Sequence, residues 1–158
     1  MTKARSIADE FSEAVNAHLA SLETKVDAAL ARLVESDAAA AQWLLFEYDS
    51  PRFAETFAVT VVPMLAGGAS GEPRPLLDDG SLVVPPAIYD DPHFEEAEPW
   101  DTASELLEQW LVKRWSLIPG SRPPAFVAHH DSFFKTDMAD GGRTSDDELD
   151  ARFKLAVN

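Results

Sequence analysis

The sequence predicts a two-layer α+β domain in which helices cover a mainly antiparallel sheet of about four strands. Residues 5–35 repeat apolar side chains at the spacing of a helix. Residues 43–62 hold two apolar runs separated by turn residues, which is typical of a β-hairpin. Such a hairpin is not stable alone in water, so helices are expected to cover at least one of its faces.

The first expected element is a long N-terminal helix over residues 5–35. Its apolar residues recur three and four positions apart and form one stripe, made of Ile7, Phe11, Val15, Leu19, Leu22, Val26, Leu30 and Leu33. Alanine at many other positions favours the helix further. The stripe could pack on the sheet or on a second copy of the chain, so the sequence leaves open a homodimer through this helix.

Strands are expected over residues 43–49 and 56–62. The first is apolar on both faces, whereas the second alternates, with Phe57, Val59 and Val61 on one face. The glycine- and proline-containing stretch 66–79 is expected to be a loop. A third strand is expected over residues 81–84, resuming at 87–89, and its two neighbouring prolines would restrict it to an edge of the sheet.

Two capping-box patterns mark the remaining helices. Thr102 and Glu105 predict a middle helix that runs to about Ser116, and Ser145 and Glu148 predict a C-terminal helix. Between them, residues 125–129 are expected to form the fourth strand. No repeat or long linker divides the chain, so residues 1–158 are expected to be one domain. The predicted core consists of Trp43, Leu45, Phe57, Val59, Val61, Leu107, Trp110 and Leu111.

Charge is the strongest compositional signal. The chain has 28 acidic and 13 basic residues, a formal net charge of −15. Residues 78–101 hold eight acidic residues and no lysine or arginine. Nucleic acid and anionic membranes would be repelled, which disfavours both as partners. The acidic surface could simply keep the chain soluble, or it could steer a basic protein partner.

The expected partner-binding residues lie at the end of this acidic run. Trp100 stands among carboxylates, and tryptophan is enriched at interface positions that dominate binding energy. Trp100 could instead fold back onto the start of the middle helix. The expected partner-binding set is Asp90, Asp91, Glu95, Glu96, Glu98, Trp100 and Asp101.

The best candidate for enzyme chemistry is the run His129-His130-Asp131. On a strand, His129 and Asp131 would share a face and could hold a metal with help from another segment. A surface His–Asp pair at a strand end is the favoured interpretation. The chain has no cysteine, which excludes thiolate ligands, a cysteine nucleophile and disulfides. The sequence therefore predicts a protein that is not an enzyme, with no catalytic residue, metal or cofactor.

These features favour a small acidic protein that binds a basic protein partner. In size, charge and lack of cysteine the chain resembles the immunity proteins of bacterial toxin systems, which implies an inhibitor of a basic toxin domain. In its expected order of elements it is similar to class I type III secretion chaperones, which implies a dimer that binds an effector segment. A metal-dependent enzyme using His129 and Asp131 is a third alternative. No signal-peptide pattern and no long apolar segment is present, so a cytoplasmic location is expected.

Overall fold

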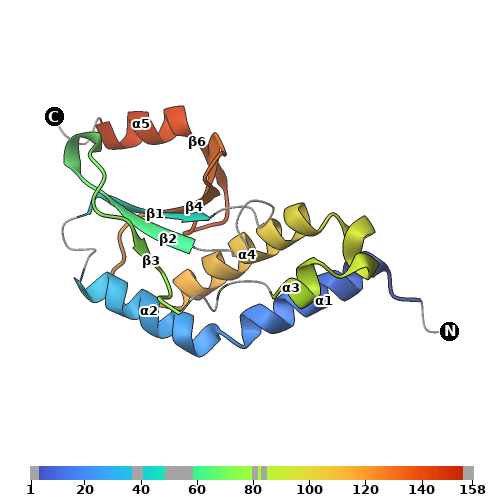
Figure 1. Cartoon of the computed structure of the whole chain (residues 1–158). Helices are drawn as coiled ribbons and strands as arrows, with labels where there is room; N and C mark the ends of the chain where they lie inside the picture. Colours follow the sequence, from blue (N-terminus) through green and yellow to red (C-terminus); the bar gives the residue numbers. More distant parts are fainter. Residues whose placement is uncertain (1–3, 37–40, 49–58, 80–81, 83–84, 155–158) are drawn as a thin grey trace.

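The computed structural model describes residues 4–36, 41–48, 59–79, 82 and 85–154 (Figure 1). These residues form an α+β structure with a six-stranded sheet in the order β3-β2-β1-β4-β5-β6. The elements are α1 (Ile7–Ala20), α2 (Glu23–Ser36), β1 (Trp43–Tyr48), β2 (Val59–Met64), the 3₁₀ turn η1 (Ala66–Gly68), β3 (Arg74–Pro75), α3 (Pro86–Tyr89), the 3₁₀ helix η2 (Pro92–Ala97), α4 (Pro99–Ser116), β4 (Ala125–His129), β5 (Phe134–Asp137), β6 (Arg143–Ser145) and α5 (Asp146–Lys154).

The sheet is mixed, which corrects the expected, mainly antiparallel sheet of about four strands. Its two central strands, β1 and β4, run parallel, and Tyr48 lies opposite His129 at their carboxyl ends. The other pairs are antiparallel. A parallel pair needs a crossover connection, and the chain between β1 and β4 includes α4 on one face of the sheet.

The strands differ from expectation at both edges of the sheet. β1 and β4 were predicted, and β2 extends to Met64, whereas residues 49–58 lie outside the described part. The short β3 falls in the expected loop. Leu82 lies in a turn, residues 81, 83 and 84 are outside the described part, and residues 86–89 form α3. Pro86 suits the first position of a helix, where its missing N–H needs no partner.

The expected N-terminal helix is divided into α1 and α2. At the break, the backbone N–H of Leu22 bonds to the carbonyl of Leu19 at 3.0 Å, which tightens the turn. The apolar stripe nevertheless continues across both helices and is buried within the chain at Phe11, Val15, Leu19, Leu22, Val26 and Leu30. The bend therefore lets α2 lie under the sheet while α1 runs on beside α4 and η2 (Figure 1).

The starts of α4 and α5 differ in how well they were predicted. α4 begins at Pro99, not at Thr102, after Glu98 in a left-handed conformation with a φ of 49°. The hydroxyl of Thr102 donates to the carbonyl of Ala97 at 3.0 Å instead of capping a helix start. The capping box of α5 is confirmed, since the Ser145 hydroxyl accepts from Glu148 N–H at 3.2 Å and Glu148 accepts from Ser145 N–H at 3.4 Å.

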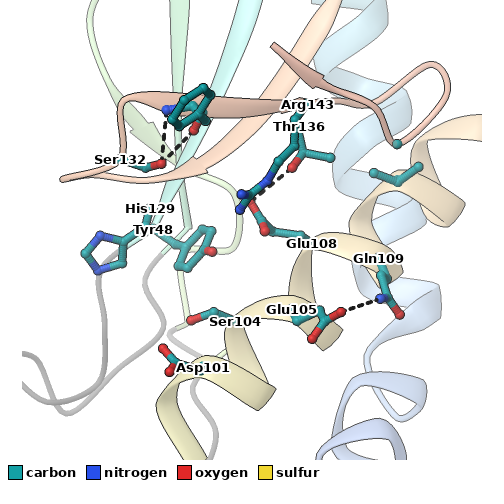
Figure 2. A pocket seen from close by; sticks show the side chains of 13 residues that line it. Tyr48, Asp101, Ser104, Glu105, Glu108, Gln109, His129, Ser132, Thr136 and Arg143 are labelled. Atoms are coloured by element: carbon teal, nitrogen blue, oxygen red, sulfur yellow. Dashed lines mark hydrogen bonds between the residues drawn. The ribbon is translucent and has the colours of Figure 1, made fainter. Parts of the chain in front are cut away.

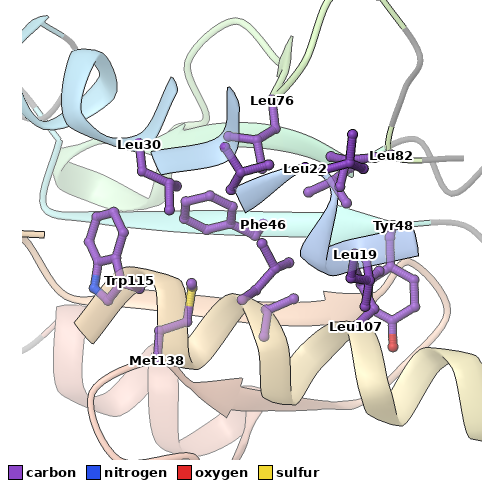
Figure 3. Close-up of a cluster of buried hydrophobic side chains, with 14 of the residues drawn as sticks. Leu19, Leu22, Leu30, Phe46, Tyr48, Leu76, Leu82, Leu107, Trp115 and Met138 are labelled. Atoms are coloured by element: carbon purple, nitrogen blue, oxygen red, sulfur yellow. The ribbon is translucent and has the colours of Figure 1, made fainter. Parts of the chain in front are cut away.

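The core lies on both faces of the sheet. One cluster fills the space between the sheet and α1, α2 and α4, and includes Phe46, Leu107 and Trp115 (Figure 3). The second cluster lies under α5 and consists of Trp43, Leu45, Phe126 and Leu149. The expected two layers are therefore supplemented by α5 on the opposite face. This arrangement explains why β1 is apolar on both of its faces.

Most of the predicted core residues that the structure describes are buried. Trp43, Leu45, Val59, Val61, Leu107 and Leu111 are buried, and Phe57 lies outside the described part. Trp110 is only half-buried, whereas Trp115 is 3% exposed. Trp115 shares the face of α4 that holds Leu111 and Leu107, four and eight residues before it. No helix among the described residues is both long and apolar enough to cross a bilayer.

Candidate functional site

A cleft lies beyond the carboxyl ends of β1 and β4. Because these strands are parallel, Tyr48 and His129 meet at the same edge of the sheet, with ring centroids 5.7 Å apart. A cavity of about 590 Å³ opens there between α4 and the β5–β6 hairpin (Figure 2). It is lined by Tyr48, Asp101, Ser104, Glu105, Glu108, Gln109, Val112, His129, Ser132, Phe134, Thr136, Gly141 and Arg143.

One face of α4 supplies the acidic wall of the cleft. Asp101, Glu105 and Glu108 recur three and four residues apart, so they lie along one side of the helix. The neighbouring side carries Leu107 and Leu111, which are buried in the core. Burial of that apolar side fixes the rotation of α4 and so turns the carboxylates toward the cleft.

Glu108 lies at the centre of the cleft's polar groups. The Thr136 hydroxyl donates to its Oε1 at 3.5 Å, and the Tyr48 side chain lies beside it in the cleft (Figure 2). Burial raises the pKa of Glu108, and the attraction of Arg143 only partly opposes this effect. The positive charge near the Glu108 carboxylate is therefore too small to offset the effect of its burial.

Tyr48 closes the inner end of the cleft. Its side chain is 3% exposed, and burial together with the negative charge of Glu108 raises its pKa far above the usual value. A hydrogen bond from Ser104 opposes this rise. Tyr48 is therefore a neutral hydrogen-bonding group in the wall of the cleft, not a phenolate.

The run His129-His130-Asp131 lies beside the cleft. β4 ends at His129, and the chain then turns, so the predicted alternation of a strand does not apply. The three side chains gather instead, with possible ligand atoms all within 4.8 Å of one another. No further histidine, cysteine, aspartate or glutamate among the described residues joins this group.

Local bonds already hold this group together. Asp131 N–H donates to His129 Nδ1 at 3.2 Å, and His130 Nε2 lies 3.1 Å from Asp131 Oδ1. Only His129 of the three lines the cleft. These contacts fit a surface turn at a strand end.

The expected partner-binding residues lie on the segment formed by residues 90–101. All of them are exposed except Asp91, which is half-buried and whose side chain accepts from His93 N–H at 3.0 Å. Trp100 is 41% exposed. The set is Asp90, Asp91, Glu95, Glu96, Glu98, Trp100 and Asp101, which we call the acidic segment.

Contacts with α1 hold the acidic segment in place. The Phe94 ring packs edge-to-face on Phe11 with centroids 5.4 Å apart, and His93 Nε2 lies 2.6 Å from a carboxylate oxygen of Glu10. Ala97 is buried as well. Phe94 and Ala97 turn toward the core, and the carboxylates of the segment face solvent.

The carboxylates of the acidic segment have no lysine or arginine partner among the described residues. Elsewhere ion pairs do form, as between Lys25 and Asp79 at 2.8 Å. Asp101 belongs both to the segment and to the cleft. The two features therefore form one continuous acidic surface.

Sequence reasoning found the acidic segment but missed the cleft. The spacing of Asp101, Glu105 and Glu108 was a usable signal for one acidic side of α4. Thr136 and Arg143 come from a hairpin that was not predicted, so their approach to Glu108 could not be inferred. Comparison of the chain with protein-family models, with curated protein sequences and with solved structures finds no match.

Proposed function

We propose that this chain is a small non-enzymatic protein that binds a basic protein partner, in the manner of an immunity protein that inhibits a toxin domain. The observation that carries the proposal is the acidic segment, whose carboxylates are exposed and form no ion pair with a described lysine or arginine. Like charges held close together repel one another, and a partner of opposite charge removes that repulsion. Their field would also speed the approach of such a partner.

Exposed aromatic side chains next to the acidic surface support the proposal. Trp100 is 41% exposed, and Phe133 and Phe134, which follow the turn after β4, are 79% and 51% exposed. Large aromatics ringed by polar groups are typical anchors of protein interfaces. The partner would thus be steered by carboxylates and held by apolar contacts.

The buried stripe of α1 and α2 favours an inhibitor over the dimeric, chaperone-like alternative. The stripe covers the sheet of its own chain, so it does not offer a second copy an apolar surface. The acidic segment lies outside this covered region. Binding of a partner there requires no rearrangement of the core.

The proposal is tested by capturing partners with charge-reversed variants. Wild-type protein is immobilised beside the Glu95→Lys, Glu96→Lys double variant, and lysate of the cells that encode the chain is passed over both. We expect a basic protein to be retained by the wild type, to elute with salt, and to be lost from the double variant. Mass spectrometry identifies it.

A matched control separates the place of the charge from its amount. The Glu35→Lys, Glu72→Lys variant changes net charge equally at exposed positions in α2 and before β3, on the other side of the molecule (Figure 1). It should retain the same protein as the wild type. Equal retention by all three baits would contradict the proposal.

A further inference from the structure

We infer that the cleft beside α4 receives an arginine side chain of the partner. This inference rests on the proposed function, and it assigns to the cleft a ligand of defined chemistry. It starts from the cavity, whose walls combine carboxylates, a buried tyrosine and an exposed phenylalanine. Such a concave site with a few converging polar groups is the usual form of a binding pocket.

Charge indicates a cation. Three carboxylates, from Asp101, Glu105 and Glu108, line the cavity against one guanidinium, from Arg143. Neither Asp101 nor Glu105 forms an ion pair with a lysine or arginine within residues 4–36, 41–48, 59–79, 82 and 85–154. A second cation is therefore attracted to the side of the cavity that α4 forms.

The shape of the surroundings favours a guanidinium over an ammonium. A planar guanidinium can donate two parallel hydrogen bonds to one carboxylate and can stack on an aromatic ring. Glu105 on α4 and Phe134 on β5 both line the cleft, and Phe134 is 51% exposed. A lysine ammonium would meet the same charge but would lack the flat contact.

Arg143 acts as an internal competitor for the acidic wall. It reaches from β6 toward Glu108, where its charge lowers the carboxyl pKa against the larger effect of burial (Figure 2). Removing it would leave the three carboxylates without an internal cation in the lining. The inference therefore makes predictions of opposite sign, with weaker binding when Glu108 is neutralised and tighter binding when Arg143 is neutralised.

The experiment uses a small probe and the full chain. N-acetyl-L-arginine methylamide is titrated into ¹⁵N-labelled protein and followed by NMR, alongside the citrulline analogue, which has nearly the same shape but no charge, and the lysine analogue. We expect saturable shifts of amide signals around Glu105, Glu108 and Thr136 with the arginine probe. The lysine probe should bind more weakly, and the citrulline probe should give no saturable shift.

Variants provide the decisive comparison. Glu108→Gln should weaken arginine binding about tenfold, a typical effect of losing one charge-assisted hydrogen bond. Arg143→Gln should tighten it, and the control Glu35→Gln should leave it unchanged. Unchanged binding in Glu108→Gln, or equal binding of the citrulline or lysine probe, would overturn the inference.

The outcome is separable from that of the proposed function. The titration needs no partner protein, so it reports on the cleft alone. If the probe fails to bind while charge reversal of the acidic segment still removes a basic partner, the inference is wrong and the proposed function stands. If the probe binds but no partner depends on the acidic segment, the proposed function fails on its own.

Discussion

The side chain of Tyr48, at the carboxyl end of β1, and the carboxylate of Glu108, on α4, line the same end of the cleft (Figure 2). The two residues lie 60 positions apart in the sequence. Burial raises the pKa of both groups, and the pKa of each also responds to the other group. This placement joins the sheet to the acidic wall of the cleft and places a poorly compensated carboxylate there.

Glu108→Gln is expected to stabilise the protein at neutral pH. The folded-state pKa of Glu108 is raised above its ordinary value of 4.5, so the folded state holds the proton more tightly than the unfolded state does. Wild-type stability therefore falls as pH rises from about that value through the folded-state pKa. The Glu108→Gln variant has no carboxyl group at this position, so its stability does not fall with pH in this way.

Urea unfolding at a series of pH values measures this effect. The variant's advantage in free energy of unfolding should be present at pH 7 and should disappear below the ordinary pKa. A variant less stable than the wild type at pH 7 would show that Arg143, Thr136 and Tyr48 together stabilise the charged form of Glu108 more than burial opposes it. If Glu108→Gln is more stable than the wild type but binds the arginine probe more weakly, Glu108 serves binding at a cost in stability.

Trp115→Ala should destabilise the protein more than Trp110→Ala. Trp115 is 3% exposed and packs against Phe46 with ring centroids 5.7 Å apart, whereas Trp110 is half-buried at the edge of the same cluster. Loss of the buried tryptophan should cost about 3–5 kcal/mol of unfolding free energy. Denaturant unfolding of both variants checks the order, and a larger loss for Trp110→Ala would contradict it.

The sequence predicted those parts of the fold that local patterns determine. The apolar runs of β1 and β4 and the capping box at Ser145 correspond to real elements. The parallel pairing of β1 with β4 has no local signal, because it depends on how the chain crosses over between them. The strands β5 and β6 were missed because they are short and half-exposed, with no clear alternation.

In the candidate site, too, the features with a local sequence signal were predicted and those that depend on tertiary contacts were not. The acidic segment was visible because its charges lie close together in the sequence. The cleft was not, because it needs Tyr48 and Glu108 to meet Arg143, which only the sheet topology brings about. The break in the N-terminal helix at Leu22 was likewise invisible to periodicity, since the apolar stripe continues through it.

Glu10→Gln is expected to lower the pKa of His93. The hydrogen bond to Glu10 is the largest cause that raises the pKa of this exposed histidine above 6.5. The attraction between His93 and Glu10 is therefore present below pH 6.5 and is lost as pH rises through the folded-state pKa of His93. NMR titration of the ring signals measures the shift.

Glu13→Gln provides the control for this measurement, because Glu13 lies on the same helix but pairs with Arg5 at 2.7 Å. The His93 pKa should move little in that variant. An unchanged His93 pKa in Glu10→Gln would show that the contact between α1 and η2 does not persist in solution. The buried and half-buried side chains of Ala97 and Phe94 would then still anchor the acidic segment.

We expect no stoichiometric transition metal in protein purified without a chelator or an affinity tag. The three possible ligands at His129, His130 and Asp131 are consecutive, and contacts among themselves already engage them. Transition-metal sites normally recruit ligands from more than one segment. Elemental analysis checks this expectation. One equivalent of metal, lost on changing His129 and Asp131 to alanine, would favour the enzyme alternative.

Association kinetics with the captured partner test the central claim, that the acidic segment is the partner-binding surface. Glu95→Lys with Glu96→Lys should slow association several-fold at low salt, and the effect should shrink as ions screen charges beyond about 10 Å at 0.1 M. Trp100→Ala should instead speed dissociation by the equivalent of about 2 kcal/mol, because an anchor acts after contact. The thermal stability of both variants should barely change, since these side chains are exposed. Unchanged association in the double variant together with unchanged dissociation in Trp100→Ala would contradict the account.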